Sequence, residues 1–169
     1  REKDDHFTGY HRLEYGLFAA NETASLVSVA DKLVADANEL KARMRSMKLA
    51  PDDLSGGAAR LARRLADGKI ESGENAYAHS DLADLNASLT GIAKMAGLVR
   101  PLIPDGSSDL AQELDARLKA ARLSLDALKS GDGYVAYDKV DVAGRRTIAE
   151  TFRALADTLD KVSNRLSLG

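Results

Sequence analysis

The residues with the clearest potential for chemistry lie near the start of the chain, in the stretch Thr8-Gly9-Tyr10-His11-Arg12-Leu13-Glu14. If this stretch is helical, His11 and Glu14 are three residues apart and their side chains point to the same side. An imidazole nitrogen and a carboxylate oxygen can then bind one metal ion. Pairs of His and Glu at this spacing build metal sites inside helical bundles. The spacing alone is common, so it supports a hypothesis and not an assignment.

A second candidate stretch runs from Glu71 to Asp81. If it is helical, Glu74, Tyr77 and Asp81 follow steps of three and four and share one face of the helix. A carboxylate in the first turn of a helix interacts favourably with the helix dipole, which explains Glu74 without a metal. His6 and His79 are isolated histidines, which are more typical of surface or core positions than of ligands.

Other chemical motifs are missing from the sequence. The loop 131–138 contains Asp132 and Asp138, but its spacing does not fit an EF-hand, and we expect a hairpin-like turn against the end of a bundle. There is no HExxH zinc motif, no GxSxG and no P-loop. The arginines of residues 60–64 are more typical of a solvated helix face than of a binding surface.

The elements that position these residues are predicted to be helices, because apolar residues recur in steps of three and four along most of the chain. We expect helices over residues 2–18, 23–47, 51–68, 71–99, 108–128 and 141–166, with Thr23 as an N-cap and Pro51 in a first turn. Their apolar faces are expected to form the core. The predicted fold is therefore all-α, an antiparallel helical bundle, with a division into two stacked units near Pro101 and Pro104.

Composition narrows the possible functions. The 169 residues suit one domain or two small ones, and a net charge of -2 gives no electrostatic case for nucleic acid. No apolar run is long enough to span a membrane. The absence of Cys rules out disulfides and thiolate ligands. Because the chain has no initiating Met, we expect it to be a fragment or a processed form.

The stretch from Gly9 to Glu14, followed by Leu17-Phe18, resembles the GxHxxE motif of the imelysin family, in particular its EfeO-like periplasmic branch. Residues 29–36, 74–82 and 131–138 are similar to the same branch, in the expected order. The resemblance implies one imelysin-like helical domain over 1–169, made of two four-helix-bundle-like units at about 1–100 and 101–169. It also implies that upstream helices, which in relatives supply another acidic residue, are missing and leave the first unit incomplete.

Carried over to this sequence, the resemblance implies a metal site formed by His11, Glu14 and Glu74. Nitrogen and oxygen ligands of this kind suit iron, with zinc and copper as alternatives. Tyr10, Tyr77 and Asp81 are candidates for a cleft or for contacts with the ligands. No catalytic residue is predicted.

The leading hypothesis is a periplasmic metal-binding protein of an iron-uptake system that delivers its ion to a membrane permease. The alternative is a periplasmic binding protein for an acidic polysaccharide such as alginate, with Arg or Lys side chains against the uronate carboxylates. Metallopeptidase activity is a minority hypothesis, because one HxxE provides no separate general base. The simplest alternative is a helical scaffold in which the HxxE is incidental.

Overall fold

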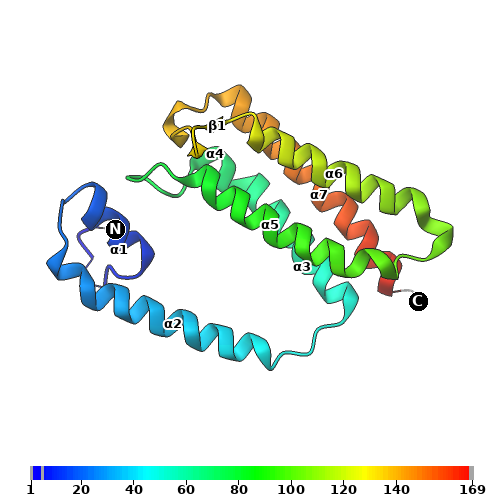
Figure 1. The fold of residues 1–169 in the computed structure, drawn as a ribbon, viewed down its shortest axis with the longest axis horizontal. Helices are drawn as coiled ribbons and strands as arrows, with labels where there is room; N and C mark the ends of the chain where they lie inside the picture. The colour runs from blue at the N-terminus through cyan, green and yellow to red at the C-terminus, as the bar shows by residue number, and fades with distance from the viewer. Residues whose placement is uncertain (1, 5, 168–169) are drawn as a thin grey trace. The chain divides into compact units, whose positions relative to one another are not determined.

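The computed structural model describes residues 2–4 and 6–167, most of which are helical (Figure 1). This confirms the all-α prediction. The elements are α1 (Tyr10–Phe18), α2 (Val27–Arg45), α3 (Pro51–Arg64), α4 (Ile70–Ser72), α5 (Asp81–Val99), α6 (Ser108–Asp126), β1 (Lys129–Ser130), β2 (Gly133–Tyr134) and α7 (Val142–Ser167). Within residues 2–4 and 6–167, we find no helix whose length and hydropathy would suit a bilayer span.

The chain forms two compact units. Unit 1 contains residues 1–48 together with the short segment 75–79, and unit 2 contains residues 49–74 and 80–169. Helices α5 and α6, which flank Pro101, both belong to unit 2. The predicted division into two bundle units near residue 101 stays a prediction.

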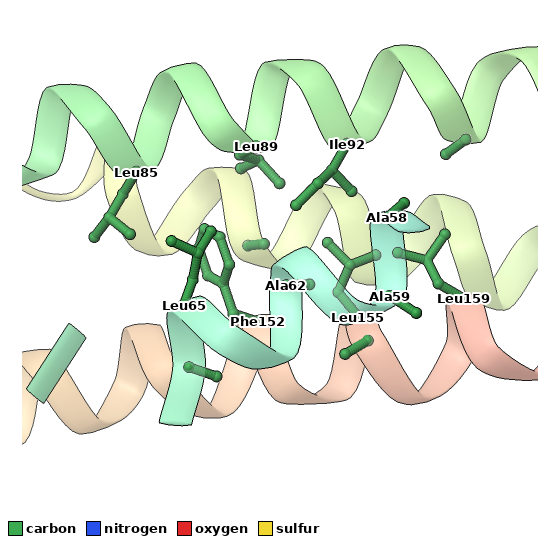
Figure 2. Close-up of a cluster of buried hydrophobic side chains, with 14 of the residues drawn as sticks. Ala58, Ala59, Ala62, Leu65, Leu85, Leu89, Ile92, Phe152, Leu155 and Leu159 are labelled. Atoms are coloured by element: carbon green, nitrogen blue, oxygen red, sulfur yellow. The ribbon is translucent and has the colours of Figure 1, made fainter. Parts of the chain in front are cut away.

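Unit 2 is a bundle of four long helices. Helix α3 packs against α5 and α7, and α6 packs against the same two helices, so the four close into a ring. Figure 2 shows the side chains that fill the space between them. The core includes the predicted apolar faces of α5, α6 and α7, which the structure confirms, with the fully buried members Leu82, Leu89, Ile92, Val99, Leu114, Leu125, Ile148, Phe152, Leu155, Leu159 and Val162.

The side of α3 that packs into this bundle carries small residues. Ala58, Ala59 and Ala62 have no exposed surface, and α3 makes its most extensive contact with α7. Alanine side chains allow two helix backbones to approach closely. They also leave room for larger side chains from the facing helix. At the start of α3, Pro51 occupies the first turn as predicted, and the Asp53 carboxylate accepts the Ala50 N–H at 3.1 Å.

The predicted turn after α6 is confirmed as a hairpin. Lys129 pairs with Tyr134 and Ser130 with Gly133 in an antiparallel ladder, and Gly131 adopts a positive φ of 56°. The next helix, α7, begins at Val142, and Asp141 caps it as its Oδ1 accepts the Gly144 N–H at 2.7 Å.

Three predicted helix boundaries are wrong. The first helix begins at Tyr10 and not at residue 2, because Gly9 has a φ of 75°. The third helix does not close at Gly68 but continues through a wider π-type turn into α4. The fourth helix begins at Asp81 and not at Glu71, because Gly73 and His79 take positive φ values of 71° and 52° and make residues 73–80 a loop.

The expected burial of the apolar face over residues 23–47 is wrong for α2, although Leu26, just before this helix, is buried. All of α2 lies in the described part of the chain, and none of its residues is buried there. Leu40 and Met44 are each 59% exposed, and Met47 is 58% exposed. An apolar stripe shows which face of a helix can be buried, but it does not provide the surface that would cover it.

Tyr137 connects the segment after β2 to α4 and makes the stability of unit 2 depend on pH. Its hydroxyl donates to the Ile70 carbonyl, and the Arg145 guanidinium lies 4.5 Å from its ring centroid. Burial raises the pKa of Tyr137 to about 12, against the opposing effect of Arg145. The folded protein therefore holds this proton more tightly than the unfolded chain, whose tyrosine pKa is about 10.

Stability due to Tyr137 should be fully present below about pH 10 and should be lost as the pH rises through about 12. We expect Tyr137→Phe to cost about 1 kcal/mol at neutral pH, because the hydrogen bond is lost, and to remove this alkaline component. Urea unfolding of both proteins between about pH 7 and 12 measures the difference. Tyr134→Phe is the control, and parallel pH profiles for wild type and Tyr137→Phe would contradict the assignment.

Candidate ion-binding site

The predicted pair His11 and Glu14 comes together on α1 in unit 1. His11 Nδ1 lies 3.0 Å from Glu14 Oε2, which is hydrogen-bond distance. The contact follows from the local helix, because side chains at i and i+3 are neighbours on one face. The two side chains differ in exposure, since that of His11 is 32% exposed and that of Glu14 is 2% exposed. The pair therefore has a partly solvent-exposed imidazole and a buried carboxylate.

The buried carboxylate of Glu14 also holds a segment distant in sequence. Its Oε1 accepts the backbone N–H groups of Tyr77 at 2.9 Å and Ala78 at 3.1 Å, both within unit 1. Burial raises the pKa of Glu14, but hydrogen bonds from His11 and from these two N–H groups outweigh it and leave the pKa below its usual value. Glu14 is therefore held as a carboxylate at neutral pH.

Aromatic rings contact one another in the same unit as the pair. The centroid of the Tyr15 ring lies 6.1 Å from that of Phe7 and 5.3 Å from that of Tyr77. The Tyr10 ring is 49% exposed and lies edge-on to His11 at 5.8 Å. The structure thus places two predicted cleft residues, Tyr10 and Tyr77, in the same unit as His11 and Glu14.

Tyr77 is poorly suited to bind an ion as a phenolate. Its hydroxyl donates to the Glu2 carboxylate, and this hydrogen bond, together with burial, raises the pKa of Tyr77 to about 12. A phenol that holds its proton this tightly is a weak competitor for a metal at neutral pH. Its role is to pack against Tyr15 and to carry one of the N–H groups that contact Glu14.

Glu74 and Asp81 belong to unit 2. They do not share a helix face as predicted, because Glu74 lies in the loop and Asp81 begins α5. The Glu74 carboxylate pairs with Lys69, and its backbone N–H donates to Asp81 Oδ1 at 2.5 Å. Among residues 2–4 and 6–167, no group of three or more His, Cys, Asp or Glu is placed to hold a metal ion. The assignment of Glu74 as a ligand stays a prediction.

The sequence-based search missed the amide groups of Tyr77 and Ala78, because the residues around them suggested a helix. It also missed a groove of about 580 Å³ in unit 2. The residues that line this groove include apolar, acidic and basic side chains, among them Val142, Ala149, Glu71, Glu150, Arg145, Arg146 and Arg153. The spacing of these arginines, which places them near one face of a helix, was a signal available in the sequence.

Comparison with known proteins gives one family and a consistent set of relatives. Residues 1–162 match the family model described as Imelysin. The proteins named iron uptake system component EfeO from Escherichia coli O157:H7, Escherichia coli strain K12 and Shigella flexneri are each 34% identical to the chain over 165 residues. These matches cover 98% of the chain and 44% of each relative, so the chain spans less than half the length of these relatives.

Proposed function

This chain belongs to the imelysin family, and we propose that it is the metal-binding part of a protein in a periplasmic iron-uptake system. The ion would be captured at the His11–Glu14 pair and passed to a membrane permease. The names of the relatives, which refer to iron uptake, support iron as the cargo. Zinc and copper are the alternatives, because they also accept nitrogen and oxygen ligands.

The observation that carries this proposal is the geometry of the pair. The 3.0 Å hydrogen bond between His11 Nδ1 and Glu14 Oε2 holds the imidazole against a buried carboxylate. The partly exposed imidazole gives an ion access from solvent. Glu74, which belongs to unit 2, stays a ligand candidate from the sequence alone.

The test is a calorimetric titration of ferrous, ferric, zinc and copper ions into the metal-stripped chain. We expect binding at one site, with the affinity reduced at least 100-fold in His11→Ala, because a lost ligand is worth about 3 kcal/mol or more. His6→Ala is the matched control, since it removes an exposed imidazole that lies outside the pair. Equal binding in His11→Ala and wild type would rule out this site, and the absence of any binding would remove the proposal for this chain.

A second candidate function is binding of an acidic polysaccharide such as alginate, and the three arginines in the lining of the unit 2 groove favour it. Arginine side chains bind carboxylates with charge-assisted hydrogen bonds, and the apolar lining residues Val142 and Ala149 suit the face of a sugar ring. Titration of an alginate oligosaccharide in the presence of a chelator separates the two functions. Binding that persists without metal and weakens in Arg146→Ala, but not in the exposed Arg64→Ala, would support the polysaccharide.

A further inference from the structure

The hydrogen bonds of Glu14 leave little of its carboxylate for an ion. An ionised carboxylate offers about four lone-pair positions. The two Tyr77 and Ala78 N–H groups use Oε1, and the His11 imidazole uses Oε2, so three positions are taken. The side chain of Glu14 is also only 2% exposed, whereas that of His11 is 32% exposed. Solvent reaches the imidazole much more readily than the carboxylate.

We propose that Glu14 is a positioning residue, which orients His11 so that the ion binds to Nε2 of the imidazole and not to Glu14 itself. This inference rests on the proposed function, because it assigns roles within the same pair. A carboxylate only accepts hydrogen bonds, so the His11 Nδ1 that faces it must carry the proton. In a neutral imidazole the other nitrogen, Nε2, then has the free lone pair that a metal requires.

The same arrangement is common around metal-binding histidines, where a carboxylate fixes the ring and its tautomer from the side away from the ion. In this chain the Glu14 carboxylate also makes a second set of hydrogen bonds. Through Tyr77 and Ala78 it also holds the segment 75–79, whose Tyr77 ring packs on Tyr15 at 5.3 Å. Binding at Nε2 leaves these amide hydrogen bonds intact. Direct binding by both residues would require His11 Nδ1 to lose its proton and the pair to open around the ion.

The two arrangements predict different spectra of the imidazole nitrogens. The experiment is long-range proton–nitrogen NMR of the ¹⁵N-labelled chain at about pH 8, where an imidazole is neutral, with and without zinc chloride as the probe. His11 is assigned by its absence from the spectrum of His11→Ala. We expect Nδ1 to be protonated and Nε2 unprotonated in the metal-free wild type. Zinc should shift Nε2, and the Tyr77 and Ala78 amide signals should keep their hydrogen-bonded positions.

Glu14→Gln is the informative variant. The oxygen of its amide can still accept the Tyr77 and Ala78 N–H groups, but its NH₂ group would face Nδ1 and donate to it. The His11 tautomer should therefore reverse, which protonates Nε2, and zinc affinity should fall about 100-fold. Glu22→Gln is the control, because Glu22 pairs with Arg12 and Ser25 and its replacement removes the same charge without contact with His11.

Two outcomes would overturn the positioning role. The first is a spectrum in which zinc shifts Nδ1 of wild-type His11, or in which the Tyr77 and Ala78 amide signals lose their hydrogen-bonded positions when zinc is added. Either result would identify Glu14 as a direct ligand. The second is an unchanged His11 tautomer in Glu14→Gln. If Glu14→Gln does not fold, the wild-type zinc spectra alone decide. A tautomer that reverses in a protein without zinc binding would support the orienting role and count against the proposed function.

Discussion

Replacing Phe152 by alanine is expected to lower the unfolding free energy of unit 2 by about 4 kcal/mol. Phe152 has no exposed surface and lies in the middle of α7, among the core side chains shown in Figure 2. The loss combines the transfer of an aromatic ring to water with the cavity left between helices that are too tightly packed to collapse. This change removes one of the largest side chains in the core.

Urea unfolding followed by circular dichroism, with hydrogen exchange of α7 amides, measures this loss. Phe18→Ala is the control, because it makes the same chemical change at a side chain that is 63% exposed. The control should change stability by no more than about 0.5 kcal/mol. Equal effects of the two substitutions would mean that Phe152 does not fill the core of the bundle.

Replacing Ala62 by leucine is expected to destabilise unit 2 by about 3 kcal/mol, although leucine is a good helix former. Ala62 has no exposed surface, and α3 packs on α7 through small residues of this kind. Three additional carbon atoms must therefore push α3 outward or force neighbouring side chains out of their preferred rotamers.

The matched control for Ala62→Leu is Ala87→Leu on α5, where the alanine is exposed. There the added side chain meets solvent, and stability should change by less than about 0.5 kcal/mol. The midpoints of urea unfolding compare the two variants. If Ala62→Leu unfolds at the wild-type urea concentration, the close approach of α3 to the bundle is wrong.

The parts of the structure that the sequence could predict are those set by local spacing. His11 and Glu14 meet because residues three apart on a helix are neighbours. The core faces of α5, α6 and α7 follow from apolar residues at steps of three and four, and Phe152 and Leu159 are buried as predicted. Asp141 caps the start of α7, because its side chain accepts an N–H of the first turn.

The loop 73–80 could not be predicted in the same way. Its sequence suits a helix, but Gly73 and His79 have positive φ values, and His79 is not a residue type that signals this conformation strongly. What holds the loop is a carboxylate from a distant part of the chain, since Glu14 accepts the Tyr77 and Ala78 N–H groups. A local pattern carries no information about such a partner. For this reason the sequence identified Glu14 as a ligand candidate but missed its contacts with the backbone.

The segment 75–79 also has a consequence for the order of folding. Tyr77 and Ala78 lie 63 and 64 residues after Glu14, and all of α3 and α4 separates them from α1. During synthesis, α1 is therefore made before the amide groups that occupy the Glu14 carboxylate. Closing so long a loop has an entropic cost, and this cost is offset only when the Glu14 hydrogen bonds to Tyr77 and Ala78 form. The surroundings of His11 are thus expected to reach their final form only after the segment 75–79 has been made, and therefore later than α1 itself.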